Sequence, residues 1–482
     1  MGETLGLSLF LSALGIYLHA ISIALVIGGS TLAFLLEILS LIRRDDIYHQ
    51  ISYRVVKIVA IVFAFGAVSG TIVEFGLVQV WSGFLLIMGS TGLFPFYLEL
   101  IAFMIEAGLL AFLVYGWNRF KSRYIIIGLI GAISFGSNLS GALIMVVNSW
   151  MNVPWGMGEY IKNIYPWAPS YGPDYVNERL LNEILNLIGN GSGSLSTHLS
   201  IEILNNLVDK YGPLITNPWA AFGGMYVWVS IAHQLLATII VGVSWYVSIL
   251  TYRYWKGEKK LLNPILDIML ILAILMILQG IVGHDMGVQV IKYQPTKFAL
   301  IAGLNESGPD PVAGLTTYGD PNHIFPGFEK FIKDTINKYG DSSDLENMSI
   351  LKDVLRAREY LPIIFPMYTT KIVLSIVAGV IGILFIYVWL KRYIWDLHEN
   401  KLVFLIWIFS ILVTIAASLG WAVRELGRKP WTIYGLFHPE DLLSMVELNI
   451  FTAGVIIGGI TLSLLLMMIT IYYAVWRGER WV

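Results

Sequence analysis

The chain has 482 residues, of which 56% are hydrophobic and only 13% are charged, and its formal net charge is -2. This composition is too apolar for an ordinary soluble domain, and without a basic excess we expect no nucleic-acid partner. The chain contains no cysteine, which excludes disulfides, iron–sulfur clusters and thiolate haem ligands. Any bound metal or haem must therefore use His, Met, Glu, Asp or Tyr.

Apolar runs long enough to cross about 30 Å of hydrocarbon recur along the whole chain. The sequence therefore predicts an all-α integral membrane protein of about nine transmembrane helices, with residues 1–482 forming a single membrane domain. The first run carries His19 and lacks the basic start of a cleaved signal peptide, so we expect it to be a mature helix. The runs lie near residues 14–42, 55–80, 94–116, 124–148, 220–250, 263–283, 369–390, 402–422 and 449–475.

Basic residues follow every odd-numbered span. The positive-inside rule then places the N-terminus outside and the C-terminus inside. In that register two long polar segments, 149–219 and 284–368, both lie on the outer side, as loops and not as separate domains. The basic clusters are Arg43, Arg44, Arg54 and Lys57; Arg119, Lys121 and Arg123; Arg253, Lys256, Lys259 and Lys260; Lys391, Arg392 and Lys401; and Arg477 and Arg480.

Imidazoles at membrane depth are costly and usually face a bundle interior. His19 lies early in the first span and His233 early in the fifth, so both should sit in the outer half. Either one alone fits a metal ligand as well as a hydrogen bond between helices. Two at similar depth in a chain without cysteine favour a haem site near the outer face, where we expect the polar chemistry to gather.

Two glutamates lie in the third span. Glu99 and Glu106 are separated by about two helical turns, which puts both on one face about 10 Å apart. Two carboxylates on one stripe suit a proton relay. The alternative is a structural pair that bonds to neighbouring helices or to buried arginines.

A basic segment, GWAVRELGRKPW at 420–431, ends the eighth span on the expected outer side. Positive-inside bias disfavours Arg424, Arg428 and Lys429 at that interface. Arg428 or Lys429 pairing a buried anion such as a haem propionate would explain the placement. The alternative is an interfacial cluster that snorkels to the membrane surface.

These segments resemble the large subunit of cytochrome bd quinol oxidases. IYLHAISIALVIGGSTLAFLLE is similar to that family's first helix with its haem-ligating histidine, and FPFYLELIAFMIEAGLLAFLVYGW to its third helix with two glutamates. VSGTIVEFGLVQVWS, SFGSNLSGALIMVVNSWMNVPWG and GWAVRELGRKPW resemble three further motifs of the family in the same order. GHDMGVQVIKYQPTKFALIAG resembles the start of its quinol-binding loop, with Lys297 at the lysine position.

The resemblance implies roles for these residues. His19 would ligate one of two high-spin haems at the oxygen site, and His233 the low-spin haem b. Glu99 and Glu106 would deliver protons, Arg428 would contact haem, and Lys297 would bind quinol. The second high-spin group would be haem d or another high-spin haem.

The resemblance also implies the reaction and its setting. Quinol would give electrons at the outer face, and oxygen would be reduced to water with protons taken from inside. The partners would be the lipid bilayer and a second membrane subunit, either small-subunit-like or a paralogous large subunit. The location would be the plasma membrane of a prokaryote.

Three positions depart from the family pattern. Ala302 stands where a glutamate is expected after the lysine, with Glu306 one turn further along. The methionine expected opposite His233 is replaced by Val373 or Leu374, with Met367 nearby. The glutamate expected in the last helix falls near Gly459 or Met467.

Two alternative functions follow. The departures favour a divergent large-subunit paralogue with an incomplete haem and quinol set, acting as the partner of a complete subunit. A haem-free ion transporter could use the same intramembrane carboxylates. The paired broken helices of an inverted-repeat transporter are not visible in the sequence.

Overall fold

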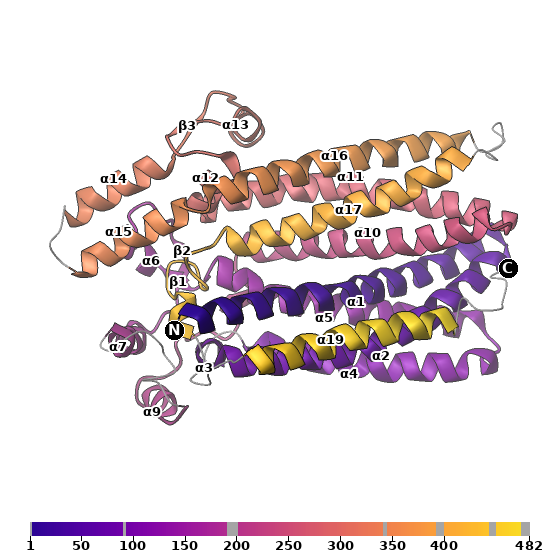
Figure 1. Cartoon of the computed structure of the whole chain (residues 1–482), viewed down its shortest axis with the longest axis horizontal. Coiled ribbons are helices and arrows are strands. Elements are labelled where there is room, and N and C mark those ends of the chain that lie inside the picture. The colour runs from indigo at the N-terminus through magenta and orange to yellow at the C-terminus, as the bar shows by residue number, and fades with distance from the viewer. Residues whose placement is uncertain are drawn as a thin grey trace.

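Long helices that run along one axis make up most of the computed structural model (Figure 1). The structure describes residues 2–89, 93–189, 201–340, 345–391, 400–442 and 450–473. Arg392, Arg477 and Arg480 of the predicted basic clusters lie outside these ranges. In this part of the chain nine helices are long and apolar enough to cross a membrane, which confirms the predicted class.

The spanning helices are longer than the apolar runs at their polar ends. α11 continues past residue 283 to Tyr293, and α16 begins at Leu361. Leu5, Leu7 and Leu9 in the first turns of α1 pack against a core outside the apolar belt. The nine are α1 (Gly2–Arg43), α2 (Asp46–Val80), α4 (Leu93–Gly116), α5 (Arg123–Asn152), α10 (Met225–Trp255), α11 (Leu262–Tyr293), α16 (Leu361–Leu390), α17 (Asn400–Leu426) and α19 (Ile450–Ile471).

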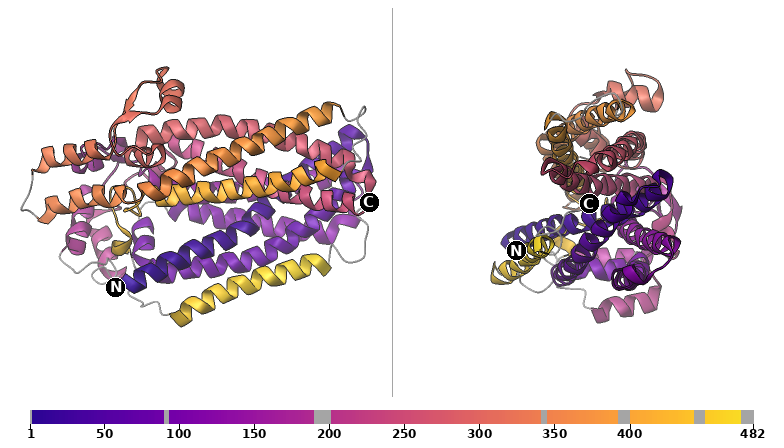
Figure 2. Two further views of the ribbon diagram at one scale, coloured as in Figure 1. Left: turned by 45° about the horizontal axis from the view of Figure 1, so that its top comes forward. Right: turned by 90° about the vertical axis from the view of Figure 1, so that its right-hand side faces the viewer.

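The nine helices form two groups, seen end-on in Figure 2. One group contains α1, α2, α4, α5 and α19. In the other, each helix packs against two neighbours in the order α10, α11, α16, α17 and back to α10. α10 and α16 therefore lie diagonally across a four-helix bundle.

Two glycines bring the groups together where α1 crosses α10. A Cβ atom added to Gly28 would lie 2.6 Å from the Cα atom of Gly242, and one added to Gly242 would overlap the carbonyl oxygen of Ala24. Only glycine allows this approach, because any side chain would push the backbones apart. The same close approach of small residues is common between membrane helices.

A cap covers one end of the bundle, which we call the cap end; the cap comprises residues 153–224, 294–360 and 427–442. It contains most of the two predicted polar segments, whose ends at 149–152, 284–293 and 361–368 belong to α5, α11 and α16. The cap lies at the end of the bundle where α1 starts (Figure 1). Its elements are β1 (Met157–Gly158), α6 (Tyr160–Ile164), β2 (Tyr171–Asp174), α7 (Glu178–Gly189), α9 (Ile201–Tyr211), α12 (Pro295–Ala302), β3 (Gly308–Pro309), α13 (Pro311–Tyr318), β4 (Ile324–Phe325), α14 (Phe328–Tyr339), α15 (Leu345–Arg358) and α18 (Pro439–Leu442). β1 pairs antiparallel with β2, and β3 with β4.

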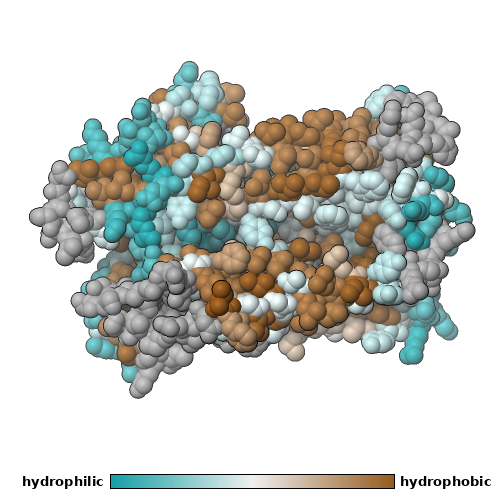
Figure 3. Space-filling view, viewed as in Figure 1, coloured by the Kyte–Doolittle hydropathy of each residue, from teal (hydrophilic) through white to brown (hydrophobic). Residues whose placement is uncertain are grey.

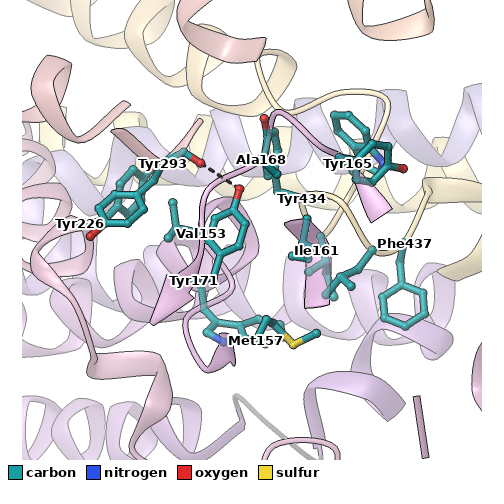
Figure 4. Close-up of a cluster of buried hydrophobic side chains, with 14 of the residues drawn as sticks. Val153, Met157, Ile161, Tyr165, Ala168, Tyr171, Tyr226, Tyr293, Tyr434 and Phe437 are labelled. Atoms are coloured by element: carbon teal, nitrogen blue, oxygen red, sulfur yellow. Dashed lines mark hydrogen bonds between the residues drawn. The ribbon is translucent and has the colours of Figure 1, made fainter. Parts of the chain in front are cut away.

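A buried aromatic core fixes the cap to the bundle (Figure 4). The hydroxyl of Tyr171 on β2 donates to the backbone oxygen of Tyr293 at the end of α11, at 3.0 Å. Tyr226 of α10 and Tyr434 of the loop after α17 are buried in the same cluster. The cap is therefore continuous with the helices. Figure 3 shows apolar side chains along the middle of the molecule and hydrophilic ones toward both ends.

Buried polar groups also lie at the end opposite the cap, so the expectation that they gather on one side is wrong. Asp267 on α11 is 4% exposed and accepts hydrogen bonds from Nε and Nη2 of Arg43, at 3.0 and 2.8 Å. Tyr48 and Trp389 also donate to it. Four helices converge on this one carboxylate, which stabilises that end of the bundle. The pattern depends on which helices are neighbours, and the sequence does not show that.

Candidate functional site

His233 lies on α10 and faces α11 inside the four-helix bundle. Its Nδ1 atom is 3.1 Å from the amide nitrogen of Gln279, and Gly283 leaves space beside the ring, where an added Cβ would lie 3.5 Å from Cε1. The partner of one ring nitrogen decides which nitrogen a metal can use. As placed, the Gln279 nitrogen donates to Nδ1, which puts the proton of the neutral ring on Nε2. If the amide turned so that its Oε1, buried without a partner among the described residues, accepted from Nδ1–H, Nε2 would be the atom that could ligate iron.

His19 lies on α1 and contacts α2. Its Nδ1 atom is 3.0 Å from the hydroxyl of Ser69, and that hydroxyl donates to the backbone oxygen of Gly66 at 3.0 Å. Ser69 must then accept a hydrogen bond from Nδ1–H of His19. The Nε2 atom of the neutral ring keeps its lone pair, which could bind a metal. Gly70 lies against the ring, since an added Cβ would come within 2.9 Å of Cε1.

The two histidines lie at one depth. Gly28 and Gly242 meet where α1 and α10 cross. Each histidine precedes its glycine by the same number of residues, equivalent to about 14 Å of helix toward the cap. Both imidazoles are therefore on the cap side of the crossing, one in each group of helices.

Glu99 and Glu106 on α4 both face α5. Ser140 donates to Glu99 at 2.7 Å, and Ser137 makes a very short hydrogen bond to Glu106, which is 3% exposed. Ser137 also receives a hydrogen bond from Ser30 of α1 at 3.4 Å. The shared face is as expected from the spacing. The structural alternative expects such hydrogen bonds from the glutamates to a neighbouring helix. A proton relay would use the same serine hydroxyls, so these contacts fit both interpretations.

Arg424 near the end of α17 joins three helices at the cap end. Its guanidinium donates to Asn148 and Ser149 of α5 and, at 2.6 Å, to Ser230 of α10. The residue is 8% exposed. Its charge is thus held inside the protein, which does not fit the snorkelling alternative for this residue.

Arg428 is also buried, at 5% exposure. Its Nη2 atom binds the carboxylate of Glu425 at 2.5 Å, and Glu425 accepts a further hydrogen bond from Asn148 at 2.8 Å. Within the part of the chain that the structure describes, Nε and Nη1 of Arg428 are buried without a hydrogen-bond partner. Buried donors without partners are rare and costly. Two such donors on a guanidinium fit a carboxylate, and a haem propionate supplies one.

Lys297 on α12 points into the protein. It is 4% exposed, and its Nζ atom donates to Asn152 Oδ1 at 3.3 Å and to the backbone oxygen of Arg424 at 3.2 Å. Burial, followed by the nearby charge of Arg424, holds the pKa of Lys297 well below its usual range. The expected donor to a quinone therefore has protein partners in this structure.

The expectation that Glu306 shares a helical face with Ala302 is wrong. α12 ends at Ala302, and Gly303 caps it in the left-handed region with φ of 72°. Glu306 follows in the irregular chain and is exposed. A left-handed glycine after the last helical residue is the usual stop signal of a helix, and the sequence interpretation overlooked it.

The positions that depart from the family pattern offer no ligand of the expected kind. Val373 is 53% exposed and points out of the bundle, and Met367 packs against the cap core. In α19, Gly459 lies against Ile72, and the sulfur of Met467 is 3.9 Å from Ser22. Sequence reasoning missed two polar side chains in the four-helix bundle, Gln279 and Lys371, although both interrupt apolar spans.

The chain matches known proteins over nearly its whole length. The family model described as cytochrome bd terminal oxidase subunit I matches residues 7–479. The cytochrome bd ubiquinol oxidase subunit 1 of Bacillus subtilis (strain 168) is 23% identical over 88% of this chain and 83% of its own. The putative cytochrome bd menaquinol oxidase subunit I of the same organism is 23% identical over 91% and 88%. The solved structure of bd oxidase from Geobacillus thermodenitrificans shares this fold, with a TM-score of 0.73 over 98% of both chains at 18% identity.

Proposed function

The chain belongs to the cytochrome bd terminal oxidase subunit I family, and on this premise we propose that it is the haem-bearing subunit of an oxidase that passes electrons from quinol to oxygen. The observation that carries the proposal is the pair of unpartnered buried nitrogens of Arg428. They lie at the cap end of the bundle that holds His233. A buried guanidinium just after α17 and an imidazole on the neighbouring α10 match the propionate edge and the iron of a haem.

Two haem-binding regions are proposed, one in each group of helices. His233 would ligate a low-spin haem b between α10 and the rest of its bundle, with Arg428 binding a propionate. His19 would ligate a high-spin haem between α1 and α2, and a second high-spin haem, of b or d type, would complete the oxygen site. Haem supplies the redox change and the binding of oxygen.

The protein's residues would bind, orient and deliver protons. Ser69 would orient the His19 imidazole by accepting from Nδ1–H, as partners of metal-ligating histidines do. The Gln279 amide lies against Nδ1 of His233 and would fix the direction of that ring. Glu106 and Glu99 would carry protons from the inner side to the oxygen site. Their serine partners on α5 hold both carboxylates on one face.

The setting follows from the proposed reaction. The cap would face outward and receive quinol near α12, with Lys297 as the candidate donor to a quinone oxygen. A second membrane subunit, either small-subunit-like or a paralogous large subunit, would complete the complex in the plasma membrane of a prokaryote. The family match over residues 7–479 favours this reading over a haem-free ion transporter.

The divergent-paralogue alternative is supported by one observation. Gly459 and Met467 occupy the part of α19 where the resemblance implies a glutamate ligand. A subunit without that ligand could retain only part of the haem set and act beside a complete copy. Haem content per chain separates this alternative from the full set.

A reduced-minus-oxidised spectrum of the purified complex, with pyridine extraction of its haems, tests the proposed function. His233→Ala should remove the low-spin haem b signal, while His284→Ala, which changes an exposed histidine on α11, should leave it unchanged. Arg428→Leu should weaken retention of the same haem. A full low-spin band in His233→Ala would contradict the assignment, and a wild-type complex without haem would contradict the function.

A further inference from the structure

Lys371 is a lysine within a membrane span whose role the proposed function does not explain. It lies on α16, and its side chain extends to α17, where an added Cβ on Gly420 would lie 3.3 Å from its Cε and 3.7 Å from its Nζ. The lysine side chain therefore lies close along α17 at Gly420, with little room to spare beside its Cε.

The inner face of α16 includes Lys371. Positions 364, 371, 378 and 385 follow one another in steps of seven. Ile364, Ala378 and Phe385 are buried on this helix, and Lys371 occupies the second position of the series. Residues seven apart lie on one side of a helix. Lys371 thus faces the bundle, whereas Val373 is 53% exposed on the other side.

The amine of Lys371 and the imidazole of His233 lie at nearly one depth. Arg424 of α17 bonds to Ser230 of α10 at 2.6 Å, which aligns the two helices. Gly420, beside Lys371, is about 6 Å further from the cap than Arg424, and His233 is about 5 Å further than Ser230. Because α10 and α16 are diagonal in the bundle, the two side chains approach its axis from opposite sides.

The surroundings of Lys371 provide no anion. Among the residues that the structure describes, its Nζ atom has no carboxylate in ion-pair range, and it lies 5.6 Å from the centroid of the Tyr368 ring. An ammonium inside a membrane bundle is costly unless it is paired, whereas a neutral amine presents a lone pair.

We propose that the amine of Lys371 is the iron ligand opposite His233, so that the low-spin haem is held by an imidazole and a lysine amine. This rests on the proposed function, in that a haem must bind at His233. The bond forms between the nitrogen lone pair and iron; the ammonium releases one proton to solvent on binding, and no electron is transferred. The unpartnered nitrogens of Arg428 lie closer to the cap and suit the propionates, which leaves Lys371 at the level of the iron.

The first test uses the wild-type complex in its ferric form. Protein grown with lysine labelled with ¹⁵N at Nζ should show ¹⁵N hyperfine coupling in the low-spin signal. The near-infrared magnetic circular dichroism band should be that of an imidazole and amine pair. A band typical of imidazole and thioether would overturn the proposal, and so would a low-spin signal without ¹⁵N coupling. A complex without low-spin haem would instead overturn the proposed function.

Two variants and a control identify the residue. Lys371→Ala should convert the low-spin haem to a high-spin form. Lys371→Met should keep it low-spin but move the near-infrared band to that of a thioether and raise the reduction potential. Met367→Leu, one turn away on the same face, should match wild type. If Lys371 paired a propionate, Lys371→Met would keep the wild-type band, and that result would overturn the proposal.

Discussion

Lys297 and Asn152 meet inside the cap, with the lysine Nζ atom 3.3 Å from the amide Oδ1 atom. The lysine side chain thereby connects α12 to the end of α5. Its methylene groups also fill the space beside Gly427, where an added Cβ would lie 3.0 Å from Cε. A residue that the resemblance assigns to quinol thus has a structural function as well.

Replacing Lys297 should affect both stability and quinol oxidation. Lys297→Met keeps most of the packing against Gly427 but removes the donor, and loss of a buried hydrogen bond costs about 1–3 kcal/mol. We expect a lower unfolding temperature and slower quinol-driven oxygen consumption, with the rate from an artificial donor less affected. Glu306→Ala, at an exposed position, should leave all three measurements unchanged. A quinol rate that neither variant changes would place the donor site elsewhere, most simply in the partner subunit.

His19→Ala should abolish the carbon monoxide difference band of high-spin haem and spare the low-spin signal, because His19 lies in the other group of helices from His233. Ser69→Ala removes only the partner of Nδ1. It should keep the band and weaken haem binding about 10–100-fold, as loss of such partners does at metal sites. Loss of both haem signals in His19→Ala, or of neither, would count against the assignment.

Glu106→Gln tests the proton relay. Glutamine keeps the size of the side chain and can still accept from Ser137, but it cannot carry a proton. Oxygen consumption should fall on the order of 10²-fold, with haem content unchanged. Glu99→Gln should act in the same direction, and Glu159→Gln, at an exposed cap position, should have no effect. An unchanged rate in Glu106→Gln would favour the structural alternative.

His438 should make the stability of the cap depend on pH. Asp353 accepts from its Nε2 at 2.9 Å, and Asp441 is 3.4 Å from its Nδ1; against the opposing effect of burial, these carboxylates raise the pKa of His438 to about 10. Since the folded pKa exceeds the ordinary value of about 6.5, the stabilisation is complete below pH 6.5 and is lost as the pH rises through 10.

The measurement compares unfolding temperatures of wild type and His438→Gln across this range. The difference should be largest at pH 6.5 and vanish above pH 10. Lys330→Met, which removes an exposed pair with Asp334, should show no such trend. A difference that is constant with pH would mean that the carboxylates do not stabilise the charged imidazole.

Hydropathy predicted the spanning helices because a run of about twenty apolar residues is stable mainly where it can cross the hydrocarbon core of a membrane. Side-chain direction was harder to predict. α12 ends before Gly303, so Glu306 does not lie on the helical face of Ala302. A glycine at this position is a possible helix cap that the sequence itself contains. Asp267 lies within the predicted span 263–283, but nothing in that span indicates its partners, since Arg43, Tyr48 and Trp389 come from three separate helices.

The sequence predicted only those features of the candidate site that depend on positions along a single helix. Each histidine could be placed in depth by counting residues along its own helix. That Lys371 lies across from His233 depends on the order in which α10, α11, α16 and α17 pack. One sequence does not contain that order. Spacing within a helix is readable from the chain, and neighbours between helices are not.

The crossing at Gly28 and Gly242 has a consequence for electron transfer. α1 carries His19 and α10 carries His233, and the two backbones touch at this point. Under the proposed function, the crossing would act as a fixed spacer between the two redox centres. Because tunnelling rates fall exponentially with distance, a methyl group at either glycine would slow the transfer of electrons between the centres without altering either set of ligands.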